Sequence, residues 1–293
     1  MLAALRVTTS LLKLRIGTTI AASALAGLAV TPGPAPSAGQ AAALSLAVLG
    51  AAGAAGAFNH YFERETDVLM ARTARRPFAS GMLKPGPAWP ITFAALLVAS
   101  IALAWAAAGA PSAAYVFLGA FTYAFVYTAW LKRRTAWNIV IGGLAGSFAV
   151  LAGAAAVDPT PGVVPVLLAI IVFLWTPPHF WSLAAAKAED YAGAGFPMLP
   201  VVAPERVWTG AILAHALAIA VLSLVPLWFG MGAFYAAGAA SGGLYFAWTS
   251  WRLWAQPSRR NAMRNFAASL CQLMLLVGGI LIEAAFGASQ WTV

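Results

Sequence analysis

Long apolar stretches, separated by short polar segments, run through almost the whole chain of 293 residues. A helix of about 20 apolar residues crosses the hydrocarbon core of a bilayer. Cutting the sequence at its polar clusters and Gly/Pro-rich segments predicts nine such helices: Ile16–Val30, Ala41–Phe58, Trp89–Gly109, Ala113–Trp130, Ile139–Val157, Val163–Ala184, Val207–Phe229, Met231–Trp254 and Phe266–Phe286. The first stretch also has features of a secretory signal, because Arg6, Lys13 and Arg15 precede it and small residues follow at 35–37.

The composition excludes most other classes of protein. Hydrophobic residues make up 62% of the chain and charged residues only 9%, whereas a soluble domain carries about 25% charged residues. A soluble globular protein, a disordered chain, a fibrous protein and a disulfide scaffold are therefore excluded. Cys271 lies in an apolar run, which predicts a buried structural thiol. We expect an all-α polytopic membrane protein with a single domain over residues 1–293.

The loops between the predicted helices differ in charge. All 17 lysines and arginines fall in the N-terminal tail or around the loops after the second, fourth, sixth and eighth helices. The loops on the other side have none, and basic loops normally face the cytoplasm. The pattern predicts a cytoplasmic N-terminus and a periplasmic C-terminus, and we expect a multi-pass protein of the bacterial cell inner membrane. It also accounts for the net charge of +9 without a nucleic-acid partner.

Oxygen-bearing side chains gather at the cytoplasmic end of the second predicted helix. Asn59, Glu63 and Asp67 recur every four residues, so a helix places all three on one face. Glu65 points away from that face. Such hard ligands suit Mg²⁺, which binds one or two carboxylates together with substrate phosphates. The simpler interpretation is a solvated helix end with contacts between charges four residues apart.

Basic residues follow in two loops. Arg72 and Arg76 come shortly after the acidic residues, and guanidinium groups match the oxygens of a diphosphate. Lys132 and Arg133 lie in the loop after the fourth helix, where basic residues most simply fix the topology. Asn138 opens the fifth predicted helix, where a helix cap is the simpler interpretation.

A second polar group lies at the end of the sixth predicted helix. The Pro177–Pro178 pair would kink or break this helix, and the Gly-rich segment 192–196 ends it. If the helix continues between them, His179 and Asp190 share one face. Asp190 is then a candidate ligand of a second Mg²⁺. The simpler interpretations are a surface acidic pair formed with Glu189 and a hydrogen-bonded structural histidine.

Several of these segments resemble a known family. The run Asn59–Gly81 is similar to the first motif of the UbiA-type membrane prenyltransferases, including Arg72-Thr73 and Arg76-Pro77. Further stretches resemble the heme O synthase branch of that superfamily, the protoheme IX farnesyltransferases. They are Leu12–Ile16, Tyr127–Arg133, Thr135–Gly143, Pro178–Trp181, and Asp190-Tyr191 followed by Gly195 and Pro197–Val202.

The resemblance implies nine helices around a central intramembrane cavity and a Mg²⁺-dependent enzyme that uses farnesyl diphosphate and heme B (protoheme IX) as substrates. It implies transfer of the farnesyl group to a vinyl group of protoheme IX, which gives heme O and diphosphate. Catalysis and metal binding are assigned to Asn59, Glu63, Asp67 and Asp190, and diphosphate binding to Arg72, Arg76, Lys132 and Arg133. Contacts with the prenyl chain or heme are expected from Tyr61, Tyr127, Asn138, His179 and Tyr191. His179 or His60 is a candidate to ligate or orient the heme iron.

The chain departs from the superfamily pattern in two places. Glu63 stands where many members have Asp, and only Glu189 and Asp190 remain of a longer second acidic cluster. Lys187 lies near the position where a further acid would fall.

Three alternatives stay open at this point. The chain could be another UbiA-type enzyme that prenylates a quinone precursor such as 4-hydroxybenzoate, a cation-coupled membrane transporter, or an assembly protein without chemistry. The expected partners are small lipidic substrates and membrane lipid, together with heme A synthase and cytochrome oxidase assembly factors.

Overall fold

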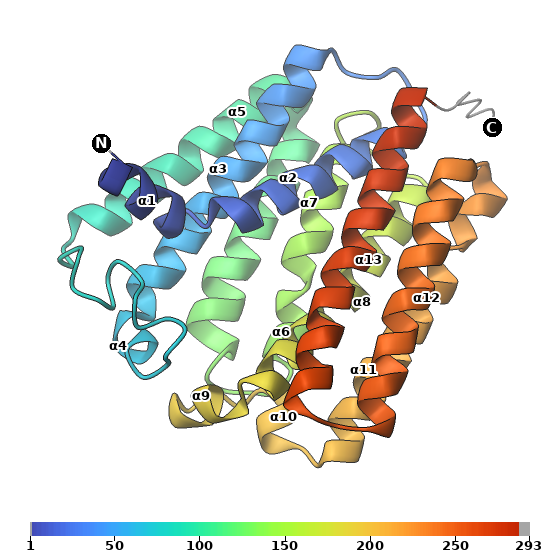
Figure 1. Ribbon diagram of the computed structural model, residues 1–293. Helices are drawn as coiled ribbons and strands as arrows, with labels where there is room; N and C mark the ends of the chain where they lie inside the picture. Colours follow the sequence, from blue (N-terminus) through green and yellow to red (C-terminus); the bar gives the residue numbers. More distant parts are fainter. Residues whose placement is uncertain (1, 287–293) are drawn as a thin grey trace.

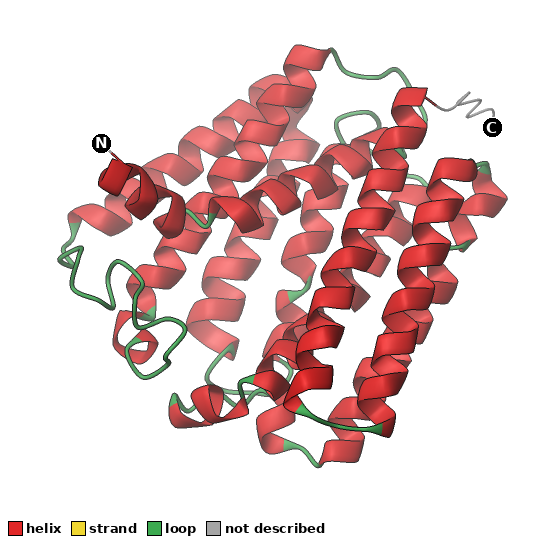
Figure 2. Ribbon diagram, viewed as in Figure 1, coloured by secondary structure: helices red, strands yellow, loops and turns green. Residues whose placement is uncertain are grey.

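The protein is a bundle of helices (Figures 1 and 2). The computed structural model describes residues 2–286, and none of these lies in a β-strand. The helices are α1 (Leu2–Leu11), α2 (Leu14–Ala29), α3 (Ala38–Phe62), α4 (Arg64–Asp67), α5 (Ala88–Phe121), α6 (Asn138–Gly142), α7 (Leu144–Ala154), α8 (Val163–Ala186), α9 (Ala188–Gly193), α10 (Leu199–Val202), α11 (Glu205–Leu222), α12 (Ala233–Ala255) and α13 (Arg259–Phe286). A π-helix, Thr122–Leu131, continues α5, and a short 3-10 helix, Val225–Phe229, follows α11. The predicted all-α fold class is confirmed.

Several helices have the length and composition of membrane spans. In the described part of the chain, five are long and apolar enough: Ala38–Phe62, Ala88–Leu131, Val163–Ala186, Glu205–Phe229 and Arg259–Phe286. The longest contains both the third and the fourth predicted spans. Gly109 (φ 81°, ψ 177°) leaves the helical conformation just before Pro111 and so divides this helix into two segments. Shorter apolar helical segments cover Leu14–Ala29 and Asn138–Ala154. The chain is a multi-pass membrane protein, and the count of nine spans stays a prediction.

Small residues let the helices approach one another closely. A Cβ atom at Gly27 would overlap the backbone of α7, and one at Gly153 would overlap the backbone of α2. Gly238 and Gly279 make the same kind of contact between α12 and α13. Close packing holds membrane helices together, since apolar burial gains little when the surrounding lipid is apolar too. The outer surface is accordingly apolar, with Trp228 as much as 82% exposed.

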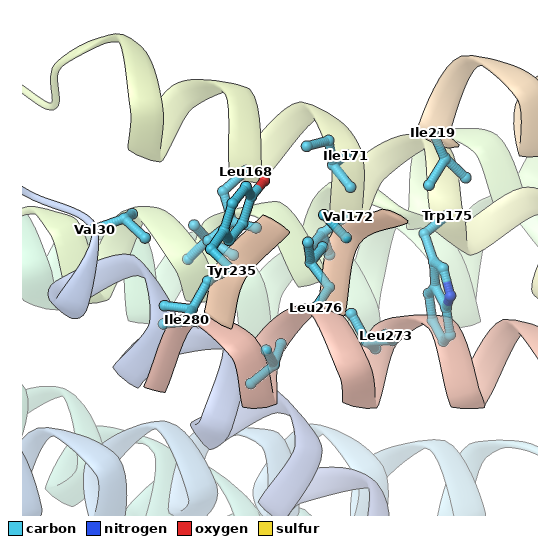
Figure 3. Close-up of a cluster of buried hydrophobic side chains, with 14 of the residues drawn as sticks. Val30, Leu168, Ile171, Val172, Trp175, Ile219, Tyr235, Leu273, Leu276 and Ile280 are labelled. Atoms are coloured by element: carbon cyan, nitrogen blue, oxygen red, sulfur yellow. The ribbon is translucent and has the colours of Figure 1, made fainter. Parts of the chain in front are cut away.

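A cluster of buried apolar side chains lies between α8, α11, α12 and α13 and extends to α2 and α7 (Figure 3). Leu168 and Trp175 of α8 and Leu276 of α13 belong to it. Its few polar atoms are paired: the Tyr235 hydroxyl donates to the carbonyl oxygen of Ser223 at 2.6 Å. None of the members of this cluster is charged, and the buried ion pairs of the described residues lie in another part of the molecule.

The sixth predicted helix differs from expectation. α8 passes through Pro177 and Pro178 as one helix, so of the predicted kink or break at the prolines, the break does not occur. Membrane helices tolerate proline where neighbouring elements cover the freed carbonyl groups. The helix ends instead at Ala186, and Lys187 (φ −128°, ψ 31°) separates α8 from α9. The condition under which His179 and Asp190 share one helix face is therefore not met.

Cys271 also differs from expectation, because it is exposed rather than buried. It lies on α13, whose outer face is apolar. A residue in an apolar run of a membrane protein can face either lipid or the protein core, and both are apolar. The sequence of the run alone does not show which of the two Cys271 faces.

The connecting elements gather at one end of the bundle. Figure 1 shows α4, α9 and α10 at the same end, with α6 close by. α3 brings Asn59 to this end and continues into α4, and the loop between α4 and α5 folds over it. The acidic residues predicted to bind metal lie here.

Candidate active site

The row of oxygen donors forms as the sequence predicts. α3 ends at Phe62, but hydrogen bonds continue the helical repeat: Glu63 N–H donates to the Asn59 carbonyl at 3.0 Å, and Asp67 N–H donates to the Glu63 carbonyl at 2.8 Å. The side chains of all three site residues are buried, with exposed fractions of 2% or less. Glu65, by contrast, has an 81% exposed side chain and pairs with Arg64 at the surface. The predicted common face is confirmed.

Two cations from distant segments close on this row. Lys132 Nζ lies 2.5 and 2.6 Å from the two carboxylate oxygens of Glu63. Arg76 Nη1 donates to both oxygens of Asp67 at 2.9 and 2.8 Å and lies 3.8 Å from Glu63 Oε2. Two predicted diphosphate residues, Lys132 and Arg76, therefore reach the predicted metal residues.

The loop after α4 folds back so that Arg76 can reach Asp67. Thr73 is fully buried, and its hydroxyl donates to the Asp67 carbonyl at 2.9 Å. Met70, 1% exposed, anchors the same turn in an apolar cluster with Phe196. In the Arg72–Arg76 segment, Thr73 thus holds the backbone of the loop, and Arg76 pairs with the Asp67 carboxylate.

Lys13 also belongs to the site, although its sequence position suggested only a topology anchor. Its ammonium donates to Asn59 Oδ1 at 2.5 Å and to the Tyr123 hydroxyl at 2.7 Å. It lies at the junction of α1 and α2, in the left-handed conformation (φ 49°, ψ 43°). In the sequence, Lys13 belongs to the Leu12–Ile16 stretch, which resembles the family. That resemblance assigned no role to Lys13 itself.

Burial and neighbouring charges shift the pKa values of these groups. Burial alone would raise the pKa of Glu63, but the Lys132 ammonium, together with Lys13 and Arg76, outweighs it and holds that pKa below its usual value. Burial lowers the pKa of Lys132, and it lowers the pKa of Lys13 well below its usual value. An anion entering the site would favour the charged forms of both lysines.

The segment after α8 covers the site from another side. The Tyr191 hydroxyl of α9 lies 3.4 Å from Arg72 Nη2, and the Phe196 ring lies 4.5 Å from Lys132 Nζ. Asp190 is half-buried on α9, and its side chain makes no hydrogen bond or ion pair with the residues described here. Arg72 is exposed. The structure therefore brings Tyr191 to the site and leaves Asp190 beside it.

Two predicted tyrosines have different surroundings. The Tyr127 ring is buried, stacks on Tyr123 at 5.9 Å between centroids and lies 5.7 Å from Lys132 Nζ. The Tyr61 hydroxyl donates to the Gly86 carbonyl at 3.3 Å, and its ring packs against aromatic residues of the loop and α5. Tyr127 faces the site cations, whereas Tyr61 supports the loop.

Three further predicted residues have neighbours outside this group. His179 Nδ1 is 2.7 Å from Ser269 Oγ, and its ring stacks between Trp175 and Phe266. Asn138 is fully buried and donates to the Thr135 carbonyl at 2.6 Å, so it shapes the loop that carries Lys132. Arg133 is exposed and donates to the Thr66 hydroxyl at 3.1 Å. His179 therefore contacts α13, Asn138 contacts its own loop, and Arg133 contacts α4.

A cavity of about 460 Å³ opens at the opposite end of the bundle. Pro36, Gln40, Gly109 and Val157 are among its lining residues, and none of the lining residues is charged. It therefore has no part in the chemistry of the site.

The donor set suits a hard divalent cation. Asn59, Glu63 and Asp67 offer one amide oxygen and two carboxylates at adjacent turns. Within residues 2–286, no group of three or more His, Cys, Asp and Glu side chains forms a metal site by itself. An incomplete set of oxygen ligands fits Mg²⁺, which completes its coordination with water and phosphate oxygens. The surrounding cations fit the phosphates.

A buried row of oxygen donors, flanked by cations and placed at one end of a bundle of membrane helices, defines an integral membrane protein with one charge-rich polar site at the end of its bundle. The sequence matches the UbiA prenyltransferase family over residues 20–276. It is 54% identical to "Protoheme IX farnesyltransferase 2" of Paramagnetospirillum magneticum over 283 residues, covering 97% of this chain and 98% of that protein. It is 40% identical to "Protoheme IX farnesyltransferase" of Acidiphilium cryptum over 285 residues, covering 94% and 89%. The chain belongs to the UbiA prenyltransferase family.

Solved structures share the fold. A UbiA homolog from Aeropyrum pernix is 20% identical, with a TM-score of 0.73 over 92% of this chain and 98% of that one. A UbiA homolog from Archaeoglobus fulgidus bound to GPP and Mg²⁺ is 16% identical, with a TM-score of 0.69 over 94% and 99%. At these identities the likeness concerns the fold alone.

Proposed function

We propose that this protein transfers the farnesyl group of farnesyl diphosphate to a vinyl group of protoheme IX, giving heme O and diphosphate. The observation that carries the proposal is the buried row Asn59–Glu63–Asp67 with Lys132 and Arg76 against it. Oxygen donors and cations in one dry site match a metal-bound diphosphate. The choice of acceptor rests on relatives named protoheme IX farnesyltransferase, one of them 54% identical to this chain.

The site residues act first on the leaving group. Magnesium, when bound by Asn59, Glu63 and Asp67, supplies positive charge that makes diphosphate a better leaving group. Lys132 and Arg76 donate hydrogen bonds that stabilise the negative charge which develops as the allylic C–O bond breaks. We assign Arg72 and Arg133 to the outer diphosphate oxygens, since both are exposed beside this end of the site.

The aromatic residues act on the prenyl group. Ionisation leaves an allylic cation that must be shielded from water until the vinyl carbon attacks. The stacked rings of Tyr123 and Tyr127 lie against the lysines of the site, where an aromatic face attracts a carbocation. Tyr191 closes the site from α9. The attack leaves the positive charge on the carbon next to the porphyrin ring. Water adds to that carbon and loses a proton, which gives the hydroxyethylfarnesyl side chain, so no strong base is needed for the new C–C bond.

We also propose a second metal ligand. Asp190 on α9 is half-buried next to Tyr191, and its carboxylate is a candidate for a second Mg²⁺. Asp190→Asn should reduce turnover by orders of magnitude, whereas Glu189→Gln, on the exposed neighbour, should leave it nearly unchanged. Equal rates for the two variants would reject the assignment.

Heme orientation is assigned to a histidine. His179 is held by Ser269 and two aromatic rings, whereas His60 Nδ1 is buried and has no partner within the part of the chain described. We therefore favour His60 over His179 for ligating or orienting the heme iron. His60→Ala should change the visible absorption spectrum of bound heme, with His215→Ala as control because His215 bonds within its own helix. Unchanged heme spectra and affinity in His60→Ala would dispose of this role.

The cellular setting follows from the topology. We propose a single domain in the bacterial inner membrane, with the metal site at its cytoplasmic rim, since the site lies at the end that carries the basic loops. Heme A synthase and cytochrome oxidase assembly factors are the proposed downstream partners, because heme O needs a protein that accepts it.

The deciding experiment compares two acceptors. The protein in detergent or nanodiscs, supplied with Mg²⁺ and farnesyl diphosphate, receives either heme or 4-hydroxybenzoate, and the product mass is measured. The proposal expects farnesylated, hydrated heme and no prenylated benzoate. Product only with 4-hydroxybenzoate would favour a quinone-type UbiA enzyme. Neither product nor diphosphate release would favour a protein without this chemistry.

A further inference from the structure

Lys13 is held in an unusual backbone conformation. Among residues 2–286, it is the one non-glycine residue with a positive φ, at 49°. The left-handed region is disfavoured for residues with a Cβ and persists where the surrounding structure fixes it. Here it turns the chain between α1 and α2 and directs the lysine side chain toward α3.

The stem of Lys13 crosses α3 where that helix has no side chain. A Cβ atom at Gly56 would lie 3.2 Å from Lys13 Cδ and 3.4 Å from Cγ. Gly53, one turn earlier, faces Leu12 at 3.5 Å in the same way. The two glycines therefore form a groove in α3 that accommodates the Leu12–Lys13 segment.

The ammonium joins a chain of hydrogen bonds that fixes the Asn59 amide. The Thr128 hydroxyl donates to the Tyr123 carbonyl at 2.8 Å, so its oxygen accepts from Asn59 Nδ2 at 3.2 Å. Asn59 Oδ1 must then face the other way, where Lys13 donates to it at 2.5 Å. Lys13 thereby sets which end of the amide faces the site.

The charges around Lys13 are unequally paired. Glu63 and Asp67 are engaged by Lys132 and Arg76, while Lys13 forms no ion pair with any residue of the described chain. A cation largely removed from water without a carboxylate partner is costly unless an anion joins it. An ammonium has three donor hydrogens, and Asn59 and Tyr123 take two of them.

We propose that Lys13 is a further diphosphate-binding residue, whose remaining N–H donates to an oxygen of the diphosphate while the other two hold Asn59 and Tyr123. This inference rests on the proposed function, because it takes a prenyl diphosphate as the ligand. It adds to the site a residue from α1–α2 that lies far in sequence from the acidic row. Replacing Lys13 with an uncharged residue should weaken the affinity for diphosphate while the protein still folds.

The test uses inorganic pyrophosphate with Mg²⁺ as probe, and its Kd is measured by calorimetry on the full chain in detergent. Lys13→Met should raise Kd about ten- to a hundredfold and raise KM for farnesyl diphosphate more than it lowers kcat. Lys13→Arg should recover part of the affinity. Arg15→Met, which removes the same charge from an exposed neighbour, should match the wild type.

The outcomes separate this inference from the proposed function. A wild-type Kd in folded Lys13→Met overturns it, whatever happens to the midpoint of thermal unfolding, because a purely structural role changes stability and leaves affinity intact. If Lys13→Met does not fold, Gly56→Ala decides: it pushes the lysine stem by a few tenths of an ångström, and an unchanged Kd there overturns the inference. If wild-type protein binds no pyrophosphate at all, the proposed function fails with it.

Discussion

Replacing Lys132 with methionine tests the central ion pair. Glu63 has a 1% exposed side chain and Lys132 a 10% exposed one, so the pair is largely shielded from water. Removing one partner of a buried pair costs about 3–5 kcal/mol, because the remaining charge stays buried. Arg76, 3.8 Å from Glu63, remains as a weaker partner, so we expect a loss near the lower limit, about 3 kcal/mol. The free energy of unfolding in detergent micelles, followed by circular dichroism, measures it.

A second substitution makes the test specific to the pair. Adding Glu63→Gln to Lys132→Met removes the stranded charge and should recover about 2 kcal/mol of the loss while turnover stays low. Arg133→Met, on the exposed neighbour of Lys132, should change stability by at most about 0.5 kcal/mol. If the double variant loses as much as the two single variants added together, the pair is not coupled and the reasoning is refuted.

Three further predictions address the site and the bundle. Asp67→Asn should lower the rate of diphosphate release by orders of magnitude in a folded protein, and a near-normal rate would remove Asp67 from the metal site. Gly153→Ala should cost about 1–3 kcal/mol, since its new Cβ meets the backbone of α2, while Gly210→Ala, with open space around it, should be tolerated; equal melting temperatures would contradict this. Glu283→Gln should cost about 0.5–2 kcal/mol, because that carboxylate accepts the N–H groups at the start of α12, and an unchanged unfolding midpoint would count against it.

Periodicity was enough to predict the acidic row. Asn59, Glu63 and Asp67 lie four residues apart, and any helical continuation places them on one face, whatever the rest of the chain does. Glu65 turned outward for the same reason. The row is therefore a local property of about three turns of helix.

Long-range contacts were harder to predict. Lys132 and Arg76 belong to different loops, and the sequence assigned both to a diphosphate without indicating which carboxylate each would meet. His179 and Asp190 were related through a helix that ends at Ala186, between them. A break in a helix at one non-proline residue has no strong sequence signal. The positions of His179 and Asp190 relative to each other therefore depend on the backbone conformation at Lys187, which only the structure gives.

Composition and the distribution of charge, by themselves, determined that this chain is a multi-pass bundle of membrane helices, because apolar stretches of this length have no other stable surroundings. They also predicted a polar site at one rim, since every basic residue falls in or near the predicted loops of one side. Only the tertiary structure decided that Lys13 enters that site. Its role depends on a left-handed turn, on Gly56 in another helix and on the Asn59 amide, and contacts between separate helices arise only when the bundle packs.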